Sequence, residues 1–193
     1  MDVIDSSWNG RRSGRCGWRR TLASACLLAF WFAPQFCLAQ AETVDPRLKV
    51  AFVYNFLKFT EWPGQAGNTA PLTLCVMNAD NELESAFAAL NGRVANGRAV
   101  TVRAVTGASG FAACHAIFVS DGAAKKMLSQ FGADQGRMLT IGDAENFVEA
   151  GGIIGLTVRE GKLRFEINLD AARQGGYQMS AQLLKLARNT QTQ

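Results

Sequence analysis

The chain has 193 residues, of which 48% are hydrophobic and 19% charged, a composition that excludes a largely disordered protein and predicts one globular domain. Most of the net charge of +4 comes from residues 1–41, which hold five of the 20 basic and two of the 16 acidic residues. Because the remaining chain is nearly neutral, it lacks the basic face of a nucleic-acid-binding protein, and we expect no nucleic-acid partner.

The first 41 residues have the three parts of an export signal. Five arginines lie between residues 11 and 20, an apolar run spans residues 22–32, and Ala39-Gln40-Ala41 has the small-x-small spacing that signal peptidase accepts. The apolar run is about half of the roughly 20 residues that a spanning helix needs, which favours cleavage over an uncleaved membrane anchor. We expect a signal peptide over residues 1–41, cleaved after Ala41 or Ala39, and a periplasmic domain over residues 42–193.

Cysteine usage follows from this cleavage. Three of the five cysteines lie in residues 1–41, so the mature chain keeps only Cys75 and Cys114. In an oxidising compartment two cysteines favour one disulfide, worth about 4 kcal/mol for a closed loop of roughly 39 residues. A redox switch is the alternative, although reactive pairs usually sit close together in sequence. No metal ligands cluster around His115, so we expect neither a metal site nor a cofactor.

The predicted elements of the mature chain alternate between helix and strand. Apolar residues at three- and four-residue steps predict a helix over residues 48–62, which Pro63-Gly64 ends. Apolar runs predict strands at residues 72–77, 100–105, 116–119, 138–141, 153–158 and 163–167. Helices or helical turns are predicted at residues 80–90, 107–114, 120–131 and 143–149, and a last helix at residues 170–188.

This order of elements predicts a single α/β domain. Alternating strands and helices indicate a mainly parallel sheet with helices on both faces. The tight turn at Glu160-Gly161 makes the last two strands a β-hairpin, and the final helix follows it.

Three aspartates, Asp80, Asp121 and Asp143, each follow a predicted parallel strand. Ligands of open α/β sheets bind at the carboxyl ends of strands, so these carboxylates would be well placed to hold a divalent cation. Each aspartate also stands where a helix needs an N-cap, which predicts a bond to backbone N–H groups instead.

The hairpin carries a row of polar side chains. Arg164, Glu166 and Asn168 alternate with apolar residues and therefore share one face of a strand, and Arg173 lies close behind them in the sequence. The row either protects an edge strand from aggregation or lines a ligand or partner site.

The first predicted helix is unusually aromatic. Phe52, Phe56 and Phe59 share one face, whereas Tyr54 and Trp62 point elsewhere. Either these aromatics belong to the core, or a second apolar face is covered by a partner protein or by another copy of this chain.

Catalytic patterns are scarce in this sequence. It contains no Gly-x-Ser-x-Gly motif, and no Walker loop or dinucleotide fingerprint occurs between a strand and a helix. His115 has no evident nucleophile beside it. These observations favour a binding protein over an enzyme.

Two segments of the chain resemble the YfiR family of periplasmic proteins. They are AFVYNFLKFTEWP at residues 51–63, and GKLRFEIN at residues 161–168 followed by a helix with Ala171-Ala172-Arg173 and Leu183-Leu184-Lys185-Leu186-Ala187. The resemblance covers essentially all of the predicted mature chain. It implies that Cys75 and Cys114 form a family disulfide, whereas a second pair found in some members is absent here.

The resemblance also implies a function. Such proteins repress a membrane-bound diguanylate cyclase by binding its periplasmic sensor domain, and dimers and small-ligand sites are family features too. We therefore expect a non-enzymatic regulator that lowers cyclic di-GMP signalling. The alternative is a small-ligand sensor with a pocket around Glu166 and Arg173. The residues expected to bind a partner or ligand are Tyr54, Phe59, Glu61, Trp62, Arg164, Glu166, Asn168 and Arg173.

Overall fold

The computed structural model describes residues 44–64, 67–121, 128, 138–187 and 190–191. The export signal predicted for residues 1–41 lies outside these ranges, as does most of the helix predicted over residues 120–131. Among the described helices, none has the length and the apolar composition needed to cross a membrane.

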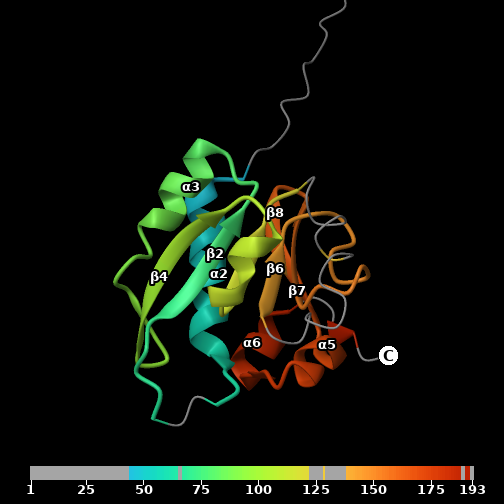
Figure 1. Cartoon of the computed structure of the whole chain (residues 1–193). Coiled ribbons are helices and arrows are strands. Elements are labelled where there is room, and N and C mark those ends of the chain that lie inside the picture. The colour runs from blue at the N-terminus through green and yellow to red at the C-terminus, as the bar shows by residue number, and fades with distance from the viewer. Residues whose placement is uncertain (1–43, 65–66, 122–127, 129–137, 188–189, 192–193) are drawn as a thin grey trace, which may run out of the picture. The chain divides into compact units, whose positions relative to one another are not determined.

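The centre of the fold is an eight-stranded sheet with the strand order β10-β8-β7-β6-β5-β2-β4-β3 (Figure 1). Strands β4, β2, β5, β6 and β7 run parallel, while β7 and β8 form the predicted antiparallel hairpin. The α/β class and the mainly parallel sheet are therefore confirmed. The strand bounds are Leu72–Met77 (β2), Val94–Ala95 (β3), Arg98–Val105 (β4), Ala116–Val119 (β5), Leu139–Gly142 (β6), Ile154–Arg159 (β7), Lys162–Asn168 (β8) and Thr190–Gln191 (β10).

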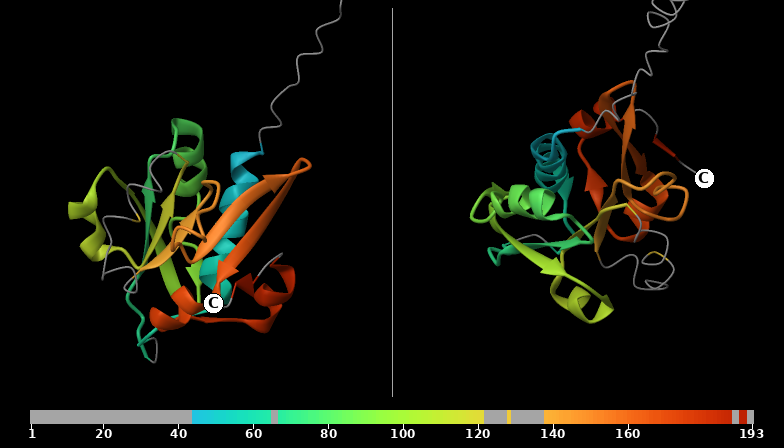
Figure 2. Two further views of the ribbon diagram at one scale, coloured as in Figure 1. Left: turned by 90° about the vertical axis from the view of Figure 1, so that its right-hand side faces the viewer. Right: turned by 90° about the horizontal axis from the view of Figure 1, so that it is seen from above.

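Each face of the sheet has its own core. Successive side chains of a strand point to opposite faces, so Leu74 and Val76 of β2 face one core and Cys75 faces the other. Helices α2 (Pro46–Phe59) and α3 (Asn81–Ala88) cover the first face. The short 3₁₀ helix η2 (Ala108–Ala113) packs on the second face (Figure 2, right).

Helix α2 begins two residues earlier and ends three residues earlier than predicted. Asp45 is its N-cap and accepts a hydrogen bond from the Arg47 backbone N–H, and Pro46 suits the first turn. The helix ends at Phe59 rather than at residue 62. Residues Thr60–Glu61 instead form strand β1, which pairs antiparallel with β9 (Gln178–Met179). Pairing with a distant segment has therefore overridden the local helical pattern.

The C-terminal segment forms two short helices rather than one long helix. Helix α5 spans Leu169–Gln174 and helix α6 spans Ala181–Leu186, with β9 between them. Gly176 separates the two because it adopts a positive φ of 75°, and a Cβ there would lie 3.3 Å from Pro63. Residues 144–149, predicted as part of a short helix, form a bend and a series of turns instead.

Trp62 lies in the core, only 6% exposed. Its indole Nε1 donates to the Leu57 carbonyl at 3.3 Å, and its ring packs edge-on against Tyr177 with centroids 5.6 Å apart. These contacts join the end of α2 to the chain that follows Gly176. Trp62 therefore fixes the junction between β1 and the C-terminal segment.

We predict that Trp62→Ala lowers the free energy of unfolding by about 3–5 kcal/mol, because it leaves a cavity and unstacks Tyr177. Leu186→Ala is the control: this side chain is 68% exposed, and its loss is expected to change stability by less than about 0.5 kcal/mol. Urea unfolding followed by circular dichroism measures both. A loss for Trp62→Ala as small as that of the control would contradict the core position.

Candidate functional site

The predicted binding residues of the first helix have different environments. Tyr54 is half-buried, and its hydroxyl donates to the Val94 carbonyl at 2.8 Å. Phe59 is partly buried against the core, and Glu61 is exposed on β1. With Trp62 inside the core, Tyr54 and Glu61 remain as polar-tipped side chains near the surface of this segment. The binding roles of all four residues stay predictions.

A groove of about 570 Å³ lies between α2 and α3. Buried Val50 and Leu90 form its apolar floor, and small side chains including Ala51 keep it open. Tyr54 is the one residue of the predicted binding set that lines it. The remaining lining residues are Pro46, Arg47, Asn55, Glu82, Ser85, Ala86, Ala89 and Arg93.

An arginine is stacked at one end of this groove. The Arg93 guanidinium carbon lies 5.4 Å from the centroid of the Tyr54 ring. Since the Tyr54 hydroxyl is itself tied to Val94, ring and guanidinium are both oriented by their neighbours. Sequence reasoning missed Arg93 because it follows α3 and approaches Tyr54 only in the folded chain.

The hairpin residues lie apart from those that line the groove. Arg164 is exposed opposite Thr157 on β7, and half-buried Glu166 lies opposite Gly155. The side chain of Asn168 caps α5 by accepting the Ala171 backbone N–H at 2.9 Å.

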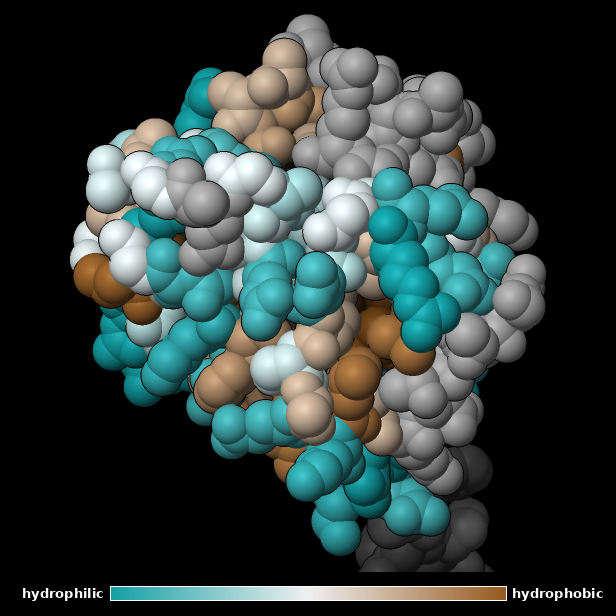
Figure 3. Space-filling model, turned by 90° about the horizontal axis from the view of Figure 1, so that it is seen from below, coloured by the Kyte–Doolittle hydropathy of each residue, from teal (hydrophilic) through white to brown (hydrophobic). Residues whose placement is uncertain are grey.

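Arg173 lies on α5, one turn beyond this cap. Its guanidinium pairs with Asp170 at 3.2 Å. Asn168 and Arg173 are thus brought onto one short helix, where each has a structural partner. Figure 3 shows the domain from below, where hydrophobic and hydrophilic side chains are mixed on the surface.

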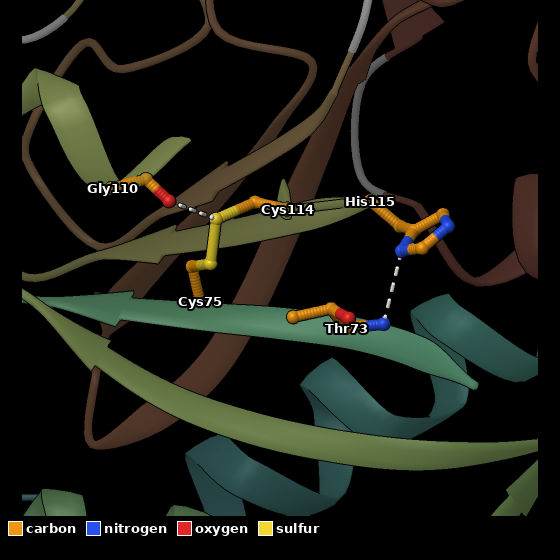
Figure 4. Close-up of a disulfide and its surroundings, with 5 residues drawn as sticks. All are labelled: Thr73, Cys75, Gly110, Cys114 and His115. Atoms are coloured by element: carbon orange, nitrogen blue, oxygen red, sulfur yellow. Dashed lines mark hydrogen bonds between the residues drawn. A yellow bond between two sulfur atoms is a disulfide. The ribbon is translucent and has the colours of Figure 1, made fainter. Parts of the chain in front are cut away.

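The disulfide between Cys75 and Cys114 is present, as predicted (Figure 4). It joins β2 to the residue two positions before β5, with 5.7 Å between the Cα atoms. Cys75 is fully buried and Cys114 is 7% exposed. Thiol–disulfide exchange requires access to a sulfur atom, so this burial favours a structural bond over a redox switch.

His115, next to Cys114, faces hydrogen-bond donors on both sides of its ring. Its Nδ1 accepts the Thr73 backbone N–H at 3.1 Å, and its Nε2 lies 2.9 Å from Nη2 of Arg98 (Figure 4 shows the Thr73 bond). Burial, with the Arg98 charge as the smaller cause, lowers the pKa of His115 below its ordinary value. A neutral ring accepts at one nitrogen only, and Nδ1 does so from Thr73. Protonation would place an N–H on Nδ1 and break this bond, so the contact also favours neutral His115.

Arg98 itself is only 3% exposed, and burial lowers its pKa as well. Its guanidinium is satisfied by carbonyl oxygens rather than by a carboxylate. Nε donates to the Ala70 carbonyl at 2.7 Å and Nη2 to the Pro71 carbonyl at 3.1 Å. The pair of Arg98 and His115 therefore fixes the loop before β2 to the strands that carry the disulfide.

The side chains of Asp80 and Asp143 have different roles. Asp80 caps α3, since its Oδ1 accepts the Leu83 backbone N–H at 2.8 Å, which confirms the capping interpretation there. Asp143 instead binds Nζ of Lys49 at 2.7 Å through one oxygen and accepts the Asp121 backbone N–H at 2.7 Å through the other. In the ranges that the structure describes, no three His, Cys, Asp or Glu side chains form a group that could hold a metal ion.

We predict that the free energy of unfolding falls as the pH drops below about 6.5, the ordinary pKa of histidine. Below this pH, His115 of the unfolded chain binds a proton, whereas His115 of the native protein stays neutral until the pH reaches its lower folded pKa. The free energy of unfolding therefore decreases between these two pKa values. Above it both states are neutral and His115 has no effect.

Urea unfolding between about pH 5.5 and 7.5 tests this, because His115 is the only histidine in the chain. The matched variant is His115→Asn, whose amide oxygen can accept the Thr73 N–H without titrating. We expect its stability to vary less with pH than that of the wild type. Equal pH dependence in both proteins would contradict the assignment.

Comparisons with known proteins concern both sequence and fold. Curated proteins give no match. Among solved structures, the ABC domain in complex with L-Trp from Streptococcus pneumonia is 12% identical with a TM-score of 0.49, covering 76% of this chain and 62% of that one. A conserved domain protein from Vibrio cholerae is 15% identical with a TM-score of 0.47, covering 76% and 60%. This chain thus spans less than two thirds of either structure.

The sequence profile of the YfiR/HmsC-like family matches residues 46–188. This match includes α2, the parallel strands from β2 to β7, the hairpin and both C-terminal helices. It therefore includes both segments in which the sequence resembles that family. The chain belongs to the YfiR/HmsC-like family.

Proposed function

We propose that this protein is exported to the periplasm, binds the periplasmic sensor domain of an inner-membrane diguanylate cyclase and holds the cyclase inactive. The observation that carries the proposal is the family match over residues 46–188, since repression of such cyclases is the function that the resemblance implies. On this proposal the protein acts by binding and performs no chemistry, and its effect is to lower cyclic di-GMP.

A repressor of this kind works through differential affinity. A ligand shifts a conformational equilibrium only as far as it binds one state more tightly than the other. A change from mostly active to mostly inactive cyclase, from 1:99 to 99:1, requires a preference of about 10⁴-fold for the inactive state. The binding surface must therefore be well ordered before it meets its partner.

Two features of the structure support the proposal. The Cys75–Cys114 disulfide suits an oxidising compartment and closes a loop with a sequence separation of 39. Helix α2 presents an outer face with a groove, while its inner face is fixed in the core by Val53, Phe56 and Leu57. A rigid helix with one open side is the kind of surface that a protein partner can use.

The first test is binding of the oxidised protein to the periplasmic domain of a membrane-bound diguanylate cyclase from the same organism, measured by titration calorimetry. We expect saturable binding. Cys75→Ser/Cys114→Ser removes a stabilisation of about 4 kcal/mol, so this variant should bind more weakly as its folded fraction falls. Heat-induced unfolding of the same samples controls for the fold. No binding by the oxidised wild type would sink the repressor proposal and favour a small-ligand sensor.

The proposed export makes a separate prediction. Protein recovered from the periplasm of cells expressing the full chain should begin at Glu42, or at Gln40 for the alternative cleavage, as read by intact mass. Replacing the small residue before the cut, in Ala41→Phe, should leave a longer form, because signal peptidase accepts small side chains there. Recovery of the wild type with its N-terminal 41 residues attached, in the membrane fraction, would contradict cleavage.

A further inference from the structure

The residues that line the α2–α3 groove carry a net positive charge. Arg47 and Arg93 both line it and are both exposed, and within the described residues neither forms an ion pair with a carboxylate. Glu82 is the only acidic residue that lines it. Two cations against one anion favour an occupant that brings its own carboxylates.

The orientation of the Arg93 guanidinium also suits it to bind a carboxylate. Its guanidinium lies over the Tyr54 ring, which orients the guanidinium and does not use its N–H donors. A planar guanidinium offers these donors as a fork that matches two carboxylate oxygens. Two other arginines differ in this respect, because Arg159 on the hairpin already contacts Glu145 at 3.8 Å and Arg173 on α5 contacts Asp170 at 3.2 Å.

Apolar surface extends beyond the floor of the groove. Leu48, 44% exposed, precedes Ala51 by three residues and Asn55 by seven, so it lies along the same side of α2. Val94, 58% exposed, directly follows Arg93. These are two of the four large hydrophobic side chains that are exposed among the described residues. Neither lines the groove itself, so only a partner that extends beyond the groove meets this apolar surface as well as the apolar floor.

The dimensions of the groove indicate an elongated occupant. Its α2 wall runs from Pro46 to Asn55, which is about 13 Å or two and a half helical turns. Helices α2 and α3 lie side by side along it (Figure 2, right). A groove between two helices is a common site for an amphipathic helix, which buries one face and leaves the other in water. Small ligands, by contrast, are usually buried over most of their surface.

We propose that the α2–α3 groove receives an amphipathic helix of the partner protein. Apolar side chains of that helix fill the space above Val50 and Leu90, and acidic side chains near its ends reach Arg47 and Arg93. This inference rests on the proposed function, because the partner is taken to be the periplasmic domain of the cyclase. It adds which surface of this chain is used and what the partner must present to it.

The experiment compares affinities for the cyclase domain by titration calorimetry. Arg93→Glu reverses the charge at one end, and Ala51→Leu fills the groove from an exposed helical position. Arg164→Glu is the matched control, since it makes the same charge change at an exposed site on the hairpin. We expect the two groove variants to bind about tenfold or more weakly and the control to change affinity by less than about threefold.

Two further readouts separate docking from folding and from simple attraction between opposite charges. Melting temperatures of all variants should match the wild type within a few degrees, since each change is at an exposed side chain. Added salt should weaken binding of the wild type more than that of Arg93→Glu, because the variant has already lost the ion pair.

The possible failures are distinguishable. If the wild type does not bind the cyclase domain, the proposed function fails and this inference fails with it. If the wild type binds and the groove variants bind equally well, only the groove assignment is overturned. Loss of binding in Arg164→Glu alone would place the partner on the hairpin. If Ala51→Leu dissociates a homodimer in light scattering without weakening cyclase binding, the groove is a self-association face and the inference is wrong.

Discussion

The position of α2 is the constraint on which the rest of the structure depends. Its inner face buries Val53, Phe56 and Leu57 against the sheet, and Phe56 also contacts Phe165 of the hairpin with ring centroids 5.0 Å apart. Lys49 ties its first turns to Asp143 at 2.7 Å, beyond the end of β6. One helix thus connects the centre of the sheet, the hairpin and the loops at the carboxyl ends of the strands.

The end of α2 is fixed by equally distant parts of the chain. The side-chain amide of Asn96 donates to the carbonyls of Leu57 and Thr60, at 3.0 and 2.7 Å, and so satisfies groups that the helix terminus leaves open. Thr60 then pairs with Met179 in the β1–β9 ladder. Since these partners lie 36 to 119 residues away, the helix end cannot be read from local sequence.

This dependence on distant partners explains how far the sequence predicts the fold. Strands β2 and β5 have the predicted bounds, because each is an apolar run buried on both faces and needs no other information. The β7–β8 hairpin was equally readable from Glu160-Gly161, both of which adopt positive φ. The predicted helix boundaries were wrong where β1 and β9 pair. Each of these strands has only two residues and is stabilised by the other, so neither can be recognised from local sequence.

The candidate site was less predictable for the same reason. The helical pattern places Tyr54 off the face that Phe52, Phe56 and Phe59 share, and Tyr54 does line the groove. Its neighbours Ala86, Ala89 and Arg93 belong to no pattern in the sequence and approach α2 only when β2 and β4 pair. Aromatic content alone could not separate Tyr54 from Trp62, because the burial of Trp62 depends on Tyr177, which follows the break at Gly176.

The fold also separates the residues that hold it together from those that remain free to bind. Buried Arg98 and neutral His115 carry a desolvation cost that their hydrogen bonds and the adjacent disulfide must offset, and they lie at the sheet. The outer side chains of α2, such as Arg47 and Ala51, take no part in those contacts. Changes on the outer face should therefore alter recognition with little effect on stability, whereas changes around Arg98 should alter stability first. This separation suits the proposed binding role, because a binding surface can be altered while the scaffold that orders it stays the same.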